Sequence, residues 1–241
     1  PVALAAFAAN QAVLIAAGLW PRSTLLGPNL TRLPAAAVAR REHETAFLHV
    51  NYGQRTEERE LRAFHTIADH YGVMQRLVTD ISYLKMIGGS SLVDQSMPIE
   101  TAPSASQDIP STYVPFRNAH LLAIAASWAE AIGAAAIFIG AVEQDSAGYP
   151  DCRPPFFDAF SRLVREGTRS GTRITINTPV INLRKKEIVL LGNKLNAPLQ
   201  LTWSCYQNSE RACGLCSSCL LRLKGFQEAG ISDPIPYAIP V

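Results

Sequence analysis

The chain has 241 residues, of which 48% are apolar, and its 22 basic and 20 acidic side chains give a net charge of +2. This length and apolar content can bury a substantial core, as one domain or as one domain with an appendage. Because the charge is balanced and no run of Lys or Arg marks a polyanion track, non-specific nucleic-acid binding is not the leading interpretation, and no nucleic-acid partner is expected.

Two apolar stretches resemble membrane segments. The first contains Ala12 to Ile15, which predict a core strand ahead of the glycine turn "AAGLWP" (16–21). We interpret this terminus as processed or trimmed, with a signal peptide as the weaker alternative. The second, Leu121 to Val142, is rich in alanine and changes character at Gly133, so we expect a buried helix followed by a buried strand. No membrane partner is therefore expected.

From Ala46 onward, strands and helices alternate. Residues 82–113 form a long loop, which in a compact domain is a lid, a binding loop or a disordered excursion. Repeated β-α-β units predict a parallel sheet covered on both faces, with ligands bound beyond the carboxyl ends of the strands. Strands are expected at 46–50, 75–81, 136–142 and 173–177, and helices at 57–71, 118–132, 155–166 and 185–195.

Four of the five cysteines lie near the C-terminus with the spacing C-x7-C-x2-C-x2-C. An odd count and tight spacing argue for metal ligation in a reducing compartment over a disulfide framework. Four thiolates suit tetrahedral zinc and leave no open position for catalysis, so a structural zinc is the first interpretation. An iron–sulfur cluster, or disulfides and free thiols, are the alternatives. The four residues are Cys205, Cys213, Cys216 and Cys219.

Three loops that follow strands carry side chains suited to binding or catalysis. Acidic residues in the loop 142–156 suit a metal ion or a polar heterocycle, and Cys152 suits a nucleophile, although an ordinary polar loop explains them as well. Arg117 and Asn118 suit an anion at a helix N-terminus, unless Asn118 is only an N-cap. Lys185 or Lys186 suits an anionic partner, or a solvated face. The histidines, His49 among them, have no metal spacing and are expected to be core or surface residues.

Five motifs together resemble one family in order and spacing, that of 7-cyano-7-deazaguanine synthase in the PP-loop ATP pyrophosphatase superfamily. The resemblance runs from about Ala46 to Tyr237. It implies a Rossmann-like (adenine nucleotide alpha hydrolase-like) α/β domain over 1–198 that binds ATP and magnesium, and a small zinc-binding helical subdomain over 199–241. The motifs are "NYGQR", "VPFRN", "GYPDCRPPF", "LTWSCY" and "CGLCSSCLLRLKGFQEAGISDPIPY".

The resemblance also implies an activity. Such enzymes are cytoplasmic ATP-dependent carbon–nitrogen ligases of queuosine biosynthesis, and they tend to form homodimers. They activate the carboxylate of 7-carboxy-7-deazaguanine, let ammonia form an amide, and activate that amide for dehydration to the nitrile. The alternative is a catalytically silent, zinc-stabilised relative that binds a nucleobase or a partner protein.

Roles for individual residues follow from the same resemblance. The four cysteines named above match the zinc ligands, and Lys185 and Arg117 are expected to be catalytic. Nucleotide-binding residues are expected to be Leu14, Ile15, Ala16, Ala17, Gly18, Ser23, Thr24 and Asn118. The deazaguanine substrate is expected to contact Gln54, Arg55, Tyr149, Asp151, Cys152 and Arg153.

One motif departs from the family pattern. The family's S-G-G-x-D-S loop directly follows the first strand, where its glycines expose backbone N–H groups to phosphates. With the first strand at 12–15, the matching residues are 16–21, which keep only Gly18 and include Pro21, which lacks an N–H. Either the loop is remodelled through Gly18 and residues 22–24, or ATP chemistry is lost, or residues 1–45 depart from the natural protein.

Overall fold

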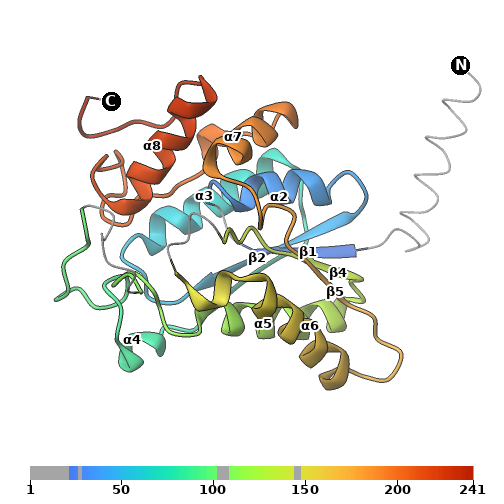
Figure 1. Ribbon diagram of the computed structural model, residues 1–241. Helices are drawn as coiled ribbons and strands as arrows, with labels where there is room; N and C mark the ends of the chain where they lie inside the picture. Colours follow the sequence, from blue (N-terminus) through green and yellow to red (C-terminus); the bar gives the residue numbers. More distant parts are fainter. Residues whose placement is uncertain (1–21, 27–28, 102–108, 144–147, 241) are drawn as a thin grey trace, which may run out of the picture.

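Five short parallel strands form the centre of the fold (Figure 1). The computed structural model describes residues 22–26, 29–101, 109–143 and 148–240. The strands lie in the order β3-β2-β1-β4-β5, and each neighbouring pair is parallel. They are β1 (Arg22–Leu26), β2 (Glu44–Asn51), β3 (Arg76–Asp80), β4 (Ala136–Phe138) and β5 (Thr175–Asn177).

Helices cover both faces of this sheet, as the alternating pattern predicts. In Figure 1, α2, α3, α7 and α8 lie on one side of the strands and α5 and α6 on the other. The predicted α/β fold with a parallel sheet is confirmed. The helices are α2 (Arg32–Ala39), α3 (Glu57–His70), α4 (Leu84–Ile87), α5 (Arg117–Ile132), α6 (Pro154–Gly167), α7 (Lys185–Lys194) and α8 (Ser217–Ala229), with short 3-10 turns η1 (Pro150–Cys152) and η2 (Leu199–Leu201).

The alternation of side chains along β2 builds two cores. Phe47 belongs to the cluster that includes Phe64 and Ile67 of α3, whereas the next residue, Leu48, belongs to the cluster that includes Leu122 of α5. Successive residues of a strand point to opposite faces, so a strand buried on both sides must be apolar throughout. This is why "AFLHV" is a nearly continuous apolar run.

Among the described residues, the first strand lies later in the chain than the one that we predicted at 12–15. β1 pairs with β2 through Ser23 and Thr45 and with β4 through Ser23 and Ala136, so residues 22–26 occupy the central position of the sheet. The predicted strand at 12–15 lies outside the described residues. Its apolar run was the stronger local signal, whereas the true strand begins with polar residues that only pairing on both sides identifies as central.

Ser23 and Thr24 therefore do not lie in the loop where we expected them. Both are fully buried within β1, and their hydroxyls have no hydrogen-bond partner among the described residues. β1 ends at Leu26 and α2 begins at Arg32, and of the residues between them the structure describes 29–31. Pro34 falls in the first turn of α2, where a missing N–H is tolerated, so a helix forms at the expected place in the fold.

The C-terminal residues are tied together by a buried ion pair. Arg222 of α8 and Asp233 are 1% and 3% exposed at their side chains, and Nε and Nη2 of Arg222 donate to the two carboxylate oxygens at 2.7 and 2.8 Å. The remaining guanidinium hydrogens reach Thr202 Oγ1 at 2.7 Å, Ser204 Oγ at 3.4 Å and the carbonyl oxygen of Leu199 at 3.4 Å. All five donors of the guanidinium are therefore used, and α8, the 199–204 segment and the tail are held as one unit.

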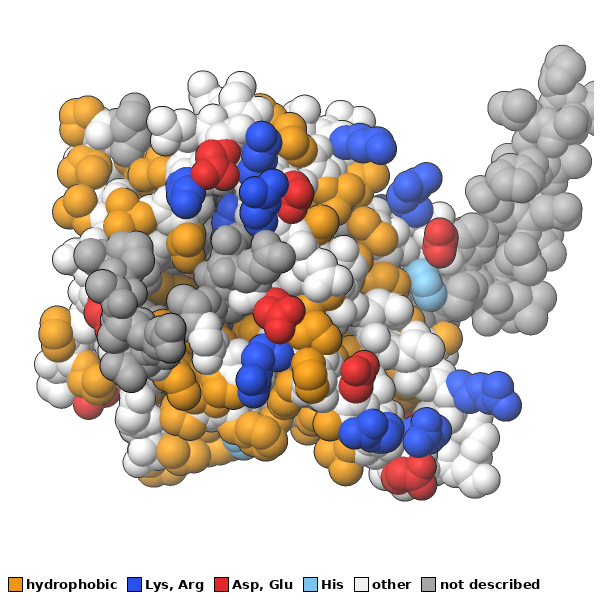
Figure 2. All heavy atoms as spheres, in the orientation of Figure 1, with side chains coloured by type: hydrophobic (Ala, Val, Ile, Leu, Met, Phe, Trp, Pro, Cys, Tyr) orange, Lys and Arg blue, Asp and Glu red, His pale blue; other side chains and the backbone are white. Residues whose placement is uncertain are grey.

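Two features of the surface bear on partners. Among the helices that the structure describes, none has the length and apolar character needed to cross a bilayer. On the face drawn in Figure 2, Lys and Arg side chains are interspersed with Asp and Glu, so that this face does not present a field of one sign.

Breaking the buried ion pair is expected to destabilise the protein strongly. Asp233→Asn leaves the Arg222 guanidinium buried without its counter-charge, and such a loss costs about 3–5 kcal/mol of unfolding free energy. Glu210→Gln is the control, because Glu210 pairs with Arg62 on the surface, where both side chains are more than half exposed, and such pairs contribute about 0–1 kcal/mol. Urea unfolding of both variants measures the difference; equal losses would contradict the assignment.

Candidate active site and metal centre

A cavity opens where β1 ends and β2 continues. The last pair of the β1–β2 ladder is Leu26 with Leu48, so His49 to Asn51 extend β2 beyond its neighbour. A cavity of about 90 Å³ lies at this step, at the carboxyl edge of the sheet, where ligands bind in open α/β folds. Its walls come from β2, α2, α3 and α5 and from the C-terminal segment, which contributes Trp203, Ser204, Tyr206 and Ser218.

Two guanidinium groups line this cavity. Arg32 is the first residue of α2 and Arg117 the first of α5, and Nη1 of Arg117 donates to the Tyr52 hydroxyl at 3.1 Å. Burial lowers the pKa of Arg32 below its ordinary value. Burial acts in the same direction on Arg117, but the charges of Tyr52, Tyr149 and Asp151 outweigh it, so the pKa of Arg117 lies above its ordinary value. Both groups stay charged, so the cavity suits an anionic group such as a carboxylate or phosphate.

The helix N-terminus beside Arg117 is already occupied by a carboxylate of the chain. Oδ2 of Asp151 accepts the backbone N–H of Asn118 at 2.9 Å, and Nδ2 of Asn118 donates to the carbonyl oxygen of Asp151 at 2.9 Å. Both side chains are buried. The anion that we predicted for the start of α5 is thus at least in part supplied by Asp151, which joins the predicted "RN" and "YPDCR" motifs into one unit.

The other predicted substrate residues make different contacts. Gln54 is buried and accepts the backbone N–H of Tyr52 at 2.9 Å, while Arg55 donates from Nε to the carbonyl oxygen of Ser91 at 2.8 Å. Cys152 is buried beside Asn118, with Asn118 Nδ2 3.3 Å from Sγ. None of these three lines the cavity of the described residues.

Tyr149 and Arg153 flank η1 at the same edge of the sheet. The Tyr149 hydroxyl lies 2.6 Å from Oγ1 of Thr112, whereas Arg153 is exposed and donates to the carbonyl oxygen of Pro150 at 3.3 Å. Lys185 begins α7, where Gly225 of α8 passes so closely that an added Cβ would lie 2.7 Å from Cβ of Lys185. Their predicted roles stay predictions.

The loop after β1 takes the place that we assigned to residues 16–24. Asn29 caps α2: its Oδ1 accepts the backbone N–H of Arg32 at 3.1 Å and the Thr31 hydroxyl at 2.8 Å. Gly140 approaches the same turn, and a Cβ there would meet the carbonyl oxygen of Thr31 at 2.5 Å. Residues 26–31 read Leu-Gly-Pro-Asn-Leu-Thr, against the family's S-G-G-x-D-S. The predicted residues Leu14, Ile15, Ala16, Ala17 and Gly18 lie outside the described residues.

Of the residues that line the cavity, only Arg117 was predicted as a site residue; Arg32, Glu60 and His49 are the charged or titratable ones that were missed. Glu60, in the first turn of α3, and His49, in β2, both line the cavity. Acidic residues at the start of α3 interact favourably with the helix dipole, which is sufficient to explain Glu60 without a ligand. A histidine in an apolar strand resembles a core residue, so neither side chain stood out in the sequence. Only the packing of α3 against the end of β2 reveals that both side chains meet the same space.

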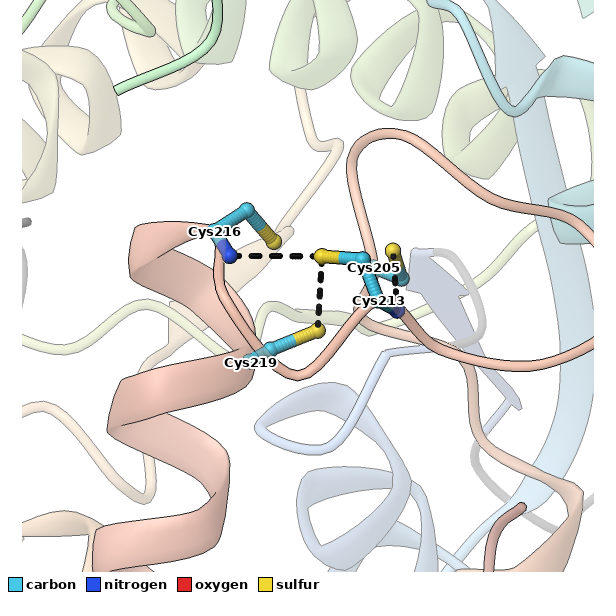
Figure 3. Close-up of side chains that lie close together, drawn as sticks. All are labelled: Cys205, Cys213, Cys216 and Cys219. Atoms are coloured by element: carbon cyan, nitrogen blue, oxygen red, sulfur yellow. Dashed lines mark hydrogen bonds between the residues drawn. The ribbon is translucent and has the colours of Figure 1, made fainter. Parts of the chain in front are cut away.

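The four C-terminal cysteines form a compact cluster that fits a metal site. Their sulfur atoms lie within 4.8 Å of one another and all are buried, and Figure 3 shows them converging from the 205–213 segment and the start of α8. Sγ of Cys205 accepts the backbone N–H groups of Asn208 and Cys213, both at 3.3 Å, and Sγ of Cys213 accepts that of Cys216 at 3.2 Å. Such donors stabilise thiolates, the form that ligates a metal.

Comparison with known proteins identifies the relatives of this chain. Residues 32–230 match the family described as "Queuosine biosynthesis protein QueC". The chain is 53% identical over 216 residues to 7-cyano-7-deazaguanine synthase of Chloroherpeton thalassium, covering 89% of this chain and 96% of that protein. It is 53% identical over 214 residues to the synthase of Chlorobium phaeobacteroides (strain DSM 266), and 50% over 216 residues to that of Chlorobaculum tepidum, in each case covering 95% of the relative.

Removing one metal ligand is expected to empty the centre and destabilise the fold. Cys219→Ser should lower the bound metal from about one ion per chain to near zero and lower Tm by about 10 °C, because a structural metal contributes folding free energy directly. Cys152→Ser, at the fifth cysteine, is the control and should retain the metal. Elemental analysis and thermal unfolding measure both; full metal content in Cys219→Ser would contradict the four-cysteine site.

His49 is expected to make stability depend on pH. Burial lowers its pKa to about 4 from an unfolded value near 6.5, so the unfolded chain binds the extra proton between these values and stability falls as pH falls. Between pH 7 and pH 5 the loss is about 2 kcal/mol. His49→Gln should lack this component, measured as the difference between wild-type and variant urea unfolding at the two pH values. A constant difference would show that His49 titrates normally.

Proposed function

Because the chain belongs to the QueC family of queuosine biosynthesis proteins, we propose that it is a 7-cyano-7-deazaguanine synthase, an ATP-dependent carbon–nitrogen ligase. The observation that carries the proposal is the 53% identity to a synthase of that name over 96% of its length. The substrates are then 7-carboxy-7-deazaguanine, ammonia and ATP, and the product is the nitrile.

The cavity fits the reacting end of such substrates. A carboxylate oxygen is a poor leaving group, and coupling it to a phosphoryl group of ATP makes it a good one. Arg32 and Arg117 would hold the negative charge of the carboxylate and of the phosphoryl group. A cavity of about 90 Å³ is far smaller than a nucleotide site, so the adenosine and the rest of the heterocycle would lie outside it. Magnesium would bind with the phosphates of ATP.

The remaining assignments are carried by the resemblance. Lys185 and Arg117 would be catalytic, and Asn118 would lie near the nucleotide. Gln54, Arg55, Tyr149, Asp151, Cys152 and Arg153 would shape the deazaguanine side of the site. For Gln54, Arg55 and Asp151 the contacts to other parts of the chain favour a positioning role.

We also propose that the four-cysteine centre holds zinc. Four thiolates provide the tetrahedral sulfur set that structural zinc prefers, and with four protein ligands there is no open position. The ion would then hold the 205–219 segment against the sheet and take no part in the chemistry. We further propose a cytoplasmic homodimer whose chains consist of a 1–198 nucleotide-binding domain and a 199–241 zinc subdomain.

One observation favours a second candidate function. The loop after β1 has Gly27 but lacks both serines and the aspartate of the family motif, and Pro28 cannot donate an N–H to a phosphate. A chain with this loop could be a silent relative that binds a nucleobase or a partner protein. The two candidates differ in whether ATP is consumed.

The decisive experiment is a reaction with 7-carboxy-7-deazaguanine, ammonium, ATP and magnesium, followed by mass spectrometry of the product. The nitrile is expected from the wild-type chain, and Arg117→Ala should lower kcat/KM about 10²–10³-fold, because a charge that stabilises the phosphoryl transfer is lost. Arg165→Ala, at an exposed position of α6, is the control. No nitrile from the wild-type chain, under conditions where a relative produces it, would favour the silent relative.

A further inference from the structure

The cavity contains two hydrogen-bond acceptors that the roles above leave unused. His49 and Glu60 both line it, His49 from β2 and Glu60 from α3. A site for a carboxylate or phosphate alone would present donors only. Acceptor-bearing side chains around the same space call for a group that carries N–H or O–H hydrogens.

The ring of His49 has a fixed tautomer with a free lone pair. Its Nε2 lies 2.8 Å from Oδ1 of Asn51, an oxygen that can only accept, so Nε2 carries the hydrogen. Nδ1 is then an acceptor; it is buried, and no described residue donates to it. Burial keeps the ring neutral at physiological pH by lowering its pKa to about 4. An unpartnered acceptor in a 2%-exposed residue points to a bound donor.

Glu60 retains lone pairs toward the cavity. Oε1 accepts the Thr56 hydroxyl at 3.0 Å and Oε2 accepts Nε2 of Gln54 at 3.4 Å, and both donors are neutral groups. A carboxylate can accept about four hydrogen bonds, so each oxygen has capacity left. Burial raises the pKa of Glu60, although Thr56, Arg32, Arg117 and Gln54 oppose the rise. The carboxylate is a stronger base than an exposed glutamate.

The charges around Glu60 favour neutral ammonia over ammonium. Arg32 and Arg117 line the cavity from α2 and α5, and Tyr52, just after β2, and Tyr206 of the C-terminal segment line it as well. Two fixed positive charges against one carboxylate disfavour a further cation. At about 90 Å³, the space suits a molecule of the size of water or ammonia beside the reacting carboxyl group.

We propose that this cavity is the ammonia site, with His49 Nδ1 accepting a hydrogen bond from the nitrogen and Glu60 accepting the proton that the nitrogen must lose. The inference rests on the proposed function and names the residue that handles the reacting nitrogen. Glu60 is then a catalytic base and His49 a positioning residue for the same atom.

The proton balance requires such a base. When ammonia attacks the activated carboxyl carbon, the C–N bond forms, the bond from carbon to the phosphoryl-bearing oxygen breaks with its electron pair on oxygen, and the nitrogen loses one proton to reach the neutral amide. Once the amide oxygen is coupled to a second phosphoryl group, breaking that C–O bond and forming C≡N releases two further N–H protons. Glu60 accepts each in turn and returns it to solvent before the next step.

The test separates activation of the acid from attack by nitrogen. Activation transfers the AMP group of ATP, with its α-phosphoryl, to the carboxylate and releases pyrophosphate. Glu60→Gln should lower the rate of nitrile formation about 10²–10³-fold, while exchange of pyrophosphate into ATP, measured with the carboxylate substrate and no ammonia, stays within about threefold of the wild type. Glu58→Gln, an exposed glutamate in the same turn of α3, is the control and should leave both rates unchanged. Retained zinc and an unchanged Tm verify that the variant is folded.

A second readout uses the wild-type chain alone. The rate at which ammonia consumes the activated carboxylate is measured against pH, with the concentration of neutral ammonia held constant. This rate should fall at acidic pH, with a midpoint above the ordinary pKa range of a glutamate. In Glu60→Gln this acidic decrease should be absent. An unchanged profile, or exchange lost as severely as nitrile formation, would overturn the role of Glu60. A wild-type chain with neither exchange nor nitrile would instead overturn the proposed function itself.

Discussion

The geometry of the site depends on the buried pair of Arg222 and Asp233. The guanidinium uses all of its donors, and Asp233 also accepts the Tyr237 hydroxyl at 2.7 Å. Desolvating two charges is costly unless every hydrogen bond is made, so this arrangement tolerates little displacement of α8, the tail or the 199–204 segment. Trp203 and Ser204, which line the cavity, therefore stand at fixed positions relative to α8.

The cysteine cluster extends the same constraint. Cys205 follows the segment that Arg222 holds, and Cys216 and Cys219 bracket the start of α8, the helix that carries Arg222. The sulfur atoms can converge because the contacts of Arg222 hold α8 next to the 199–204 segment. The cysteines also belong to the hydrophobic cluster that contains Leu48 and Leu122, so the C-terminal residues complete the core on one face of the sheet.

The opposite wall of the cavity comes from the sheet. β2 extends past the end of β1, and the first residues of α2 and α5 face the space that this step leaves. Both helices begin with an arginine, which is unfavourable for an isolated helix dipole and is explained by an anionic partner or by Asp151 at the start of α5. A small charged cavity next to a wall that carries the cysteine cluster is consistent with chemistry at one carbon atom while the larger parts of the substrates bind outside.

The sequence by itself determined the fold class and the family, and it identified the four cysteines that cluster. Alternation of apolar runs and amphipathic helices is a local property, and the C-x2-C-x2-C spacing lets sulfurs from one tight turn reach a common point. Only the tertiary structure decided which segment is the central strand. β1 begins with polar residues, so its own sequence does not identify it as a strand; its pairing with β2 on one side and β4 on the other does. The partners of Asp151, Glu60 and His49 were likewise decided by packing, since hydrogen bonds between residues far apart in the chain leave no local pattern.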